Sequence, residues 1–116
     1  MGTTELPVVC DLSALSSEQR QRLDVLLSTR IVSPDEVREL PDGYGLGFHD
    51  PSGEVLADLA EFISLDRRCC AFARYALISE PGSGRAWLEV TGPPGAGEAI
   101  AGEILARANL ETPPAG

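Results

Sequence analysis

The chain has 116 residues and a formal net charge of −9, with nine Arg and no Lys against 18 Asp and Glu. This acidic balance argues against nucleic acids and anionic membrane surfaces as partners, because both need a basic face on the protein. Hydrophobic residues make up 43% of the chain, which is enough for one core. We therefore expect a single domain over residues 1–110 and a flexible C-terminal tail over residues 111–116.

The first residues carry neither a basic segment nor an apolar run, so the sequence predicts no signal peptide and a cytoplasmic location. A composition with Arg but no Lys, rich in Ala and Gly, is typical of high-GC bacteria. In a reducing cytoplasm the three cysteines, Cys10, Cys69 and Cys70, are expected to be thiols rather than disulfides.

Hydrophobic periodicity and turn residues predict five strands and three helices. In chain order they are a strand (6–10), a helix (17–28), two strands (36–40 and 44–49), a long helix (54–72), two strands (73–80 and 85–91) and a last helix after residue 95. This β-α-β-β-α-β-β-α order predicts an α+β fold with a ferredoxin-like split βαβ core. The strand at 85–91 would add to the sheet edge, and the last helix would pack on the helical face. A different strand order for the same elements is the alternative.

The long helix contains a conflict in its hydrophobic pattern. Asp66 lies on its apolar stripe, one turn before Cys70, and Cys69 lies at the edge of that stripe. A carboxylate that faces a core must be paired, hydrogen-bonded, protonated or bound to a metal. Pairing with Arg67, Arg74 or a backbone amide is the simpler interpretation, and a functional site is the other.

The ferredoxin-like plan also predicts where Cys10 lies. The first strand and the long helix end at the same end of the sheet, so we expect Cys10 to lie close to Cys69 and Cys70. His49, the single histidine, ends a strand at the opposite end. We interpret it as a residue of a surface turn.

Three thiols and a carboxylate form a candidate metal site. Soft thiolates favour Zn²⁺, Cu(I), Hg²⁺ or As(III), and three sulfurs with a carboxylate suit tetrahedral zinc. Asp66 precedes Cys69 and Cys70 by three and four residues, so it can lie beside both. Adjacent helical residues point about 100° apart, so one ion can bind both cysteines only where the helix ends or bends. The first hypothesis is a module that sequesters, delivers or senses a soft metal through Cys69, Cys70 and Cys10, with Asp66 in support.

Two other functions fit the same residues. Cysteine is among the most buried residue types, so Cys69 and Cys70 could be inert in a structural or interaction domain. Such a domain could form a homodimer through its sheet or through Trp87, which we expect to face outward. The third hypothesis is a thiol enzyme in which Asp66 donates or accepts a proton.

Separately, glycines 45 and 47 inside a predicted strand indicate that another group packs against the backbone there.

Residues 65–72 (LDRRCCAF) and 87–93 (WLEVTGP) resemble a group of small bacterial proteins that has no settled activity. The pattern of that group is acidic-x-x-Cys-Cys-Pro-Phe, followed by Leu-x-x-Thr-Gly-Pro. This chain has Asp66 where Glu is usual and Ala71 where Pro is usual. The resemblance implies that the acid-Cys-Cys unit matters, and it implies no particular function. Because proline would stop the helix after the cysteines, its replacement removes one signal for the helix end.

Overall fold

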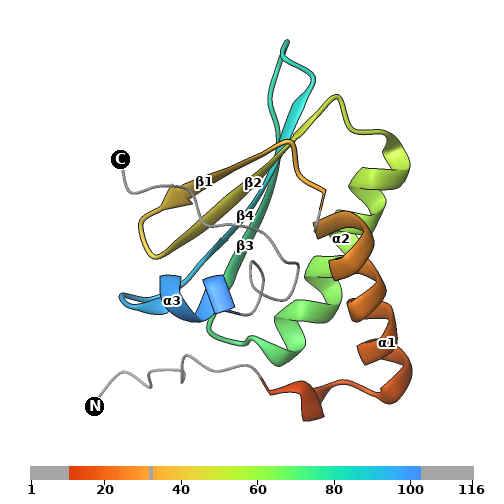
Figure 1. Ribbon diagram of the computed structural model, residues 1–116, viewed down its shortest axis with the longest axis vertical. Helices are drawn as coiled ribbons and strands as arrows, with labels where there is room; N and C mark the ends of the chain where they lie inside the picture. Colours follow the sequence, from red (N-terminus) through yellow and green to blue (C-terminus); the bar gives the residue numbers. More distant parts are fainter. Residues whose placement is uncertain (1–10, 32, 103–116) are drawn as a thin grey trace.

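The computed structural model describes residues 11–31 and 33–102. These residues form one four-stranded antiparallel sheet and three α-helices, as the predicted α+β class requires (Figure 1). The elements are α1 (Ser17–Leu26, continued by a π-helical turn at Leu27–Ile31), β1 (Glu36–Leu40), β2 (Gly43–His49), α2 (Gly53–Cys69), β3 (Arg74–Ser79), β4 (Arg85–Thr91) and α3 (Ala96–Ile100). The predicted strand at 6–10, the last helix beyond residue 102 and the tail at 111–116 lie outside the described residues.

Side-chain caps set where α1 and α2 begin. The Ser16 hydroxyl accepts a hydrogen bond from the backbone N–H of Gln19, and the Gln19 side chain accepts one from the N–H of Ser16. This reciprocal pair is a capping box. Ser52 caps α2 by accepting from the N–H of Val55. Both helices therefore begin within one residue of the predicted positions.

The core lies between two layers. Helices α1 and α2 lie side by side against one face of the sheet (Figure 1). Large apolar side chains from both layers fill the space between them, among them Leu23, Leu26, Leu46, Leu59, Phe62 and Leu88. Helix α3 adds Ala96 and Ile100 to the same core. Each large buried side chain stabilises the fold by about 1.5–3 kcal/mol relative to its exposed state.

The strand order is β1-β2-β4-β3, so β4 lies between β2 and β3. The prediction that the strand at 85–91 adds to the sheet edge is therefore wrong. A ferredoxin-like order would put the first strand between β2 and β3, and β4 holds that position. The physical reason is that β4 is buried on both faces, with Trp87 on one and Leu88 on the other, whereas β3 exposes Leu77 and Ile78.

Trp87 lies on the sheet face that α1 and α2 leave open, but it is not exposed. A Cβ atom at Gly47 would come within 2.9 Å of the Trp87 ring, and one at Gly45 within 3.5 Å. The guanidinium of Arg38 stacks on the ring, with its Cζ 4.0 Å from the centroid, and the indole Nε1 donates to Glu80 at 2.9 Å. Only 4% of Trp87 remains exposed. The glycines make room for this ring, as their pattern predicted, whereas the expectation of an exposed tryptophan is wrong.

Candidate functional site

Asp66 lies inside the core near the end of α2. The face of α2 that packs on the sheet contains Leu59, Phe62 and Leu65. Asp66 continues this face and has only 4% of its surface exposed. The predicted conflict in the helix pattern is therefore confirmed, and the surroundings of the carboxylate must resolve it.

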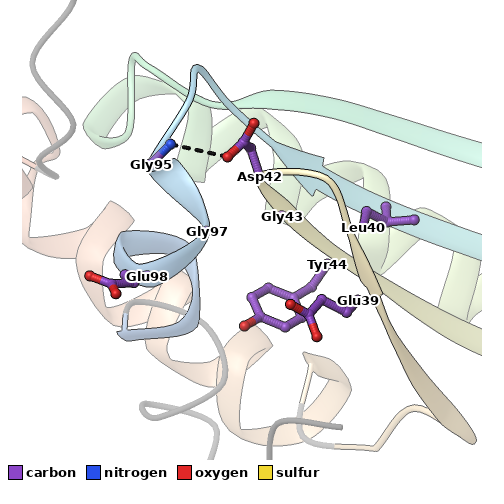
Figure 2. A pocket seen from close by; sticks show the side chains of 8 residues that line it. All are labelled: Glu39, Leu40, Asp42, Gly43, Tyr44, Gly95, Gly97 and Glu98. Atoms are coloured by element: carbon purple, nitrogen blue, oxygen red, sulfur yellow. Dashed lines mark hydrogen bonds between the residues drawn. The ribbon is translucent and has the colours of Figure 1, made fainter. Parts of the chain in front are cut away.

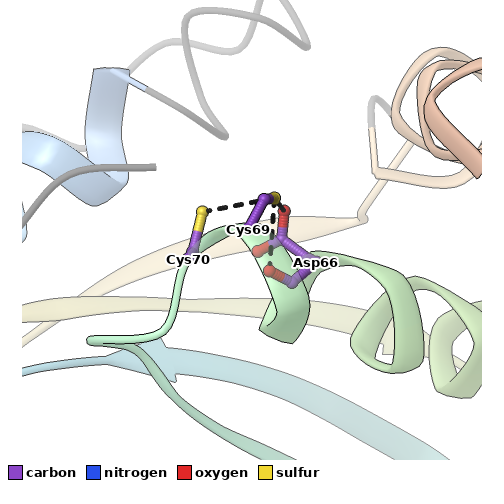
Figure 3. A group of neighbouring side chains, drawn as sticks. All are labelled: Asp66, Cys69 and Cys70. Atoms are coloured by element: carbon purple, nitrogen blue, oxygen red, sulfur yellow. Dashed lines mark hydrogen bonds between the residues drawn. The ribbon is translucent and has the colours of Figure 1, made fainter. Parts of the chain in front are cut away.

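The helix ends between the two cysteines. Cys69 is the last residue of α2, and Cys70 has left the helix, with a φ of −109° and a ψ of 67°. The N–H of Cys70 still donates to the Asp66 carbonyl at 2.8 Å, and the N–H of Ala73 donates to the Cys70 carbonyl at 3.1 Å. This turn brings the two Sγ atoms to 3.8 Å from each other (Figure 3). The bend that a shared site requires is therefore present without a proline at position 71.

Asp66 has a partner that the sequence did not predict. The hydroxyl of Tyr75, on β3, donates a hydrogen bond to Oδ2 of Asp66. The other oxygen, Oδ1, lies 3.9 Å from the Sγ of Cys69, and this Sγ lies 3.3 Å from the backbone carbonyl oxygen of Asp66. Tyr75 lies on β3, the strand that directly follows α2, and this closeness in the sequence is the signal that could have identified the contact.

The surroundings of Tyr75 keep its hydroxyl protonated. Burial raises the pKa of Tyr75 far above its ordinary value, and the Asp66 carboxylate raises it further through its charge and through the hydrogen bond. Cys69 acts on this pKa in the same direction. Tyr75 is therefore a fixed donor at neutral pH, and it holds Asp66 with its second oxygen toward Cys69.

The two cysteines of the helix end differ in covalent state. Cys69 carries a thiol, whereas Cys70 is disulfide-bonded. The prediction that all three cysteines are thiols is therefore wrong for Cys70. That prediction followed from the expected compartment, which says nothing about how close two sulfurs lie in the fold. The other half of the disulfide lies outside the described residues, as does Cys10.

Asp11, far from α2 in the sequence, contacts the C-terminal end of this helix. Its backbone N–H donates to the carbonyl oxygen of Cys69 at 2.7 Å. Asp11 directly follows Cys10 in the sequence. The expected nearness of Cys10 to Cys69 and Cys70 itself concerns a residue outside the described ones and stays a prediction, and the strand order from which it was predicted is different.

Asp66, Cys69 and Cys70 together form a candidate metal centre. One carboxylate oxygen and the two sulfurs all lie within 4.8 Å of one another, and all three residues are buried. A sulfur in a disulfide is a poor ligand, because metal ions bind the thiolate. In the disulfide form only Asp66 and Cys69 offer their ligand atoms, so the centre requires a reduced Cys70.

A separate cavity of about 390 Å³ lies between the β1–β2 hairpin and α3 (Figure 2). Three of the residues that line it are acidic, namely Glu39, Asp42 and Glu98. Oδ1 of Asp42 accepts a hydrogen bond from the N–H of Gly95 at 3.0 Å. No site residue predicted from the sequence lines this cavity. His49 also lies elsewhere, exposed at the end of β2, which agrees with its interpretation as a surface residue.

The fold and the site together define a small α+β protein with a buried Asp-Cys-Cys cluster at the end of its longest described helix. Comparison of the chain with protein-family models, with curated proteins and with solved structures finds no match to any of them. The resemblance to small bacterial proteins with an acid-Cys-Cys motif therefore stays a prediction. Within residues 11–31 and 33–102, no helix is long and apolar enough to cross a membrane.

Proposed function

We propose that the reduced protein binds one soft metal or metalloid ion through Cys69, Cys70 and Asp66, with Cys10 as a third sulfur ligand. The observation that carries this proposal is the buried cluster, in which a carboxylate oxygen and two sulfurs lie within 4.8 Å of one another. Zn²⁺, Cu(I), Hg²⁺ and As(III) are the candidate ions, because thiolates select soft ions. The biological role would be sequestration, delivery or sensing of the ion.

The distances within the cluster suit a single tetrahedral ion. Two sulfurs bound to zinc at about 2.3 Å lie roughly 3.8 Å apart in a tetrahedron, and the Sγ atoms of Cys69 and Cys70 are 3.8 Å apart. A sulfur and a carboxylate oxygen lie about 3.6 Å apart in the same geometry, against 3.9 Å between Cys69 and Asp66. Even with Cys70 in its disulfide, these three side chains already have separations close to those that a tetrahedral ion requires.

Charge also favours a cation at this position. Two thiolates and a carboxylate in a buried site repel one another and lose hydration, so all three can be ionised together only beside a positive partner, and the cysteines are otherwise protonated. A soft cation would supply that charge. Tyr75 would support the site from outside, because its hydroxyl orients the Asp66 carboxylate, as the outer partners of metal ligands do.

Reduction of Cys70 is a condition of this function. The cytoplasmic location expected from the sequence is part of the same proposal, because a reducing compartment keeps cysteines as thiols. In an oxidising compartment the disulfide would persist, and the ion would lose the Cys70 ligand.

Burial favours one alternative, which is a structural or interaction domain with inert thiols. Cys69 and Cys70 are each only 3% exposed, and buried cysteines behave as small hydrophobic residues. Because Trp87 is covered, a homodimer of such a domain would have to use another surface. If the alternative holds, a thiol reagent will label the folded, reduced protein no faster than the protein unfolds.

The test is a titration of the fully reduced protein with Zn²⁺, Hg²⁺ and arsenite, followed by thiolate-to-metal absorption. We expect binding of one ion per chain for at least one of these probes. Cys69→Ser and Cys70→Ser should each weaken it by more than about 100-fold, and Asp66→Asn by about 10–100-fold.

A matched control for the carboxylate is Asp58→Asn. Asp58 is an aspartate on the same helix, but it pairs with Arg22 and Arg30 on the α1 side, so this change should leave metal affinity within about 3-fold of the parent. Metal binding no tighter than that of simple thiols, or equal loss in Asp58→Asn and Asp66→Asn, would contradict the proposed site.

A further inference from the structure

We propose that the disulfide of Cys70 joins it to Cys10, and that this bond and a metal ion exclude each other from the same sulfur atoms. The inference rests on the proposed metal-binding function and adds its regulation. In the reduced protein the Asp-Cys-Cys centre binds the ion, and in the oxidised protein the disulfide prevents that binding.

The cysteine inventory identifies the partner of Cys70. The chain has three cysteines, and Cys69 carries a thiol, so a bond within the chain leaves Cys10. The hydrogen bond from Asp11 to the Cys69 carbonyl, 2.7 Å long, holds the residue next to Cys10 at the end of α2. Disulfide-bonded residues have Cα atoms within about 7 Å of each other, and an anchor one residue away is compatible with that distance.

The disulfide and the ion need the same atoms. In the oxidised protein the sulfurs of Cys10 and Cys70 are bonded to each other, and only the Cys69 thiol and the Asp66 carboxylate are left as ligands. Loss of a supporting partner alone lowers metal affinity by about 10–100-fold. Loss of two ligand sulfurs should therefore lower the affinity by more than about 100-fold.

Opening the centre takes two electrons and two protons, which a dithiol reductant can supply. One reductant thiolate attacks a sulfur of the Cys10–Cys70 bond, forms a mixed disulfide and displaces the other cysteine as a thiolate; the second reductant thiolate then displaces the remaining cysteine. The reductant leaves as a disulfide, and the ion replaces the protons of the new thiols. In the reverse direction a low-molecular-weight disulfide accepts the two electrons, and the ion is released.

Cys69 is the sulfur that stays outside the bond. Its Sγ lies 3.8 Å from the Sγ of Cys70, but a disulfide between adjacent cysteines would close a strained ring. Cys69 therefore keeps its thiol in both states. After unfolding without reductant, an alkylating reagent should modify one cysteine of the oxidised chain and all three of the reduced chain.

Peptide mapping tests the bond itself. Cleavage after arginine puts Cys10 in the peptide of residues 1–20 and the other two cysteines in the peptide of residues 69–74. After oxidation with glutathione disulfide, these two peptides should be cross-linked in the parent protein and in Cys69→Ser, and separate in Cys70→Ser. A cross-link that survives in Cys70→Ser, or the absence of any cross-link in the parent, would overturn the assignment.

Zn²⁺ titration of the oxidised and reduced forms tests the regulation. We expect more than about 100-fold weaker binding by the oxidised parent protein, and no effect of oxidation on the affinity of Cys10→Ser, which cannot form the bond. Equal affinity of the two parent forms would overturn the regulation and leave the proposed function standing. Failure of the reduced parent to bind any of the three ions would overturn the proposed function, whatever the peptide map shows.

Discussion

At the scale of single residues, the site depends on how Asp66 is accommodated. A buried carboxylate without partners would cost several kcal/mol. Tyr75 donates a hydrogen bond from the neighbouring strand, and the thiol of Cys69 lies against the other carboxylate oxygen. The contacts that make burial tolerable also point the carboxylate at the cysteines, so stability and the proposed chemistry use the same groups.

Replacement of Tyr75 by Phe should destabilise the oxidised protein by about 1–3 kcal/mol, because the buried Asp66 carboxylate loses a donor. Urea unfolding curves of the two proteins measure the difference. Tyr44→Phe is the matched control, since Tyr44 is half-buried but none of the hydrogen bonds found among the described residues involves its hydroxyl. Its free energy of unfolding should change by less than about 0.5 kcal/mol. Equal effects of the two changes would contradict the role of Tyr75.

The raised pKa of Tyr75 predicts a loss of stability at alkaline pH. The native state holds the phenolic proton more tightly than the unfolded chain, whose tyrosines ionise near pH 10. The contribution of the Tyr75 proton to the free energy of unfolding is therefore complete below about pH 10. It is lost as the pH rises toward the native pKa, by at most about 1.4 kcal/mol per pH unit. Unfolding measured between pH 8 and pH 11, as a range about that ionisation, should show this decline in the parent and in Tyr44→Phe. A decline just as steep in Tyr75→Phe would exclude Tyr75 as its source.

At the scale of elements, β2 and β4 depend on each other through the ring of Trp87. Gly47 lies directly opposite Trp87 in the register of the two strands. The ring occupies the space that a side chain at Gly47 would need, and Arg38 and Glu80 hold it in place. This arrangement buries the outer face of β4 without a helix, and it suits β4 to a central position in the sheet.

Gly47→Ala should destabilise the protein by about 1–3 kcal/mol, because its Cβ would meet the Cγ of Glu36 at 2.7 Å and two carbon atoms of the Trp87 ring at 2.9 Å. Gly45→Ala, on the same strand, is the control. Its nearest neighbour is the flexible Arg38 side chain at 3.3 Å, so the expected change is below about 1 kcal/mol. Trp87 is the single tryptophan, so its fluorescence reports both unfolding and any movement of the ring. A larger loss in Gly45→Ala would refute this packing.

At the scale of the whole molecule, the proposed bond between Cys10 and Cys70 closes a loop of about 60 residues. Such a loop restricts the unfolded chain and should stabilise the fold by about 4 kcal/mol in the chain-entropy model. Addition of a reductant should therefore lower the urea midpoint of the parent protein and of Cys69→Ser. Cys70→Ser should be insensitive to the reductant, and a parent protein with the same midpoint in both redox states would count against the bond.

Metal binding should recover part of that stability in the reduced protein. An ion that binds only the native state, at about 100 times its Kd, adds about 2.7 kcal/mol to the free energy of unfolding. Thermal unfolding of the reduced protein with and without Zn²⁺ measures the gain, and a chelator should reverse it. The oxidised protein serves as the control, and an equal gain there would show that the ion binds outside the cysteine centre.

The bounds of the elements were predictable because they depend on residues a few positions apart. The helix predicted at 54–72 is α2, at Gly53–Cys69, and the strand predicted at 85–91 is β4. The strand order was not predictable in the same way. Turn residues indicate that β1 pairs with β2 and β3 with β4, but they do not indicate which strands join the two hairpins. That choice follows from the burial of both faces of β4, which requires the glycines of β2 beneath Trp87.

By itself, the sequence determined that a carboxylate lies on the buried stripe of a helix beside two adjacent cysteines. The residue spacing and the apolar periodicity that predict this depend only on positions within one helix, and Asp66 is buried as they predict. Only the tertiary structure decided that Tyr75 donates to Asp66, that the helix ends so that both sulfurs meet, and that Cys70 is disulfide-bonded. These features depend on where α2 meets β3 and the chain near Asp11. Such contacts arise from the packing of distant segments, which residue spacing along one element does not specify.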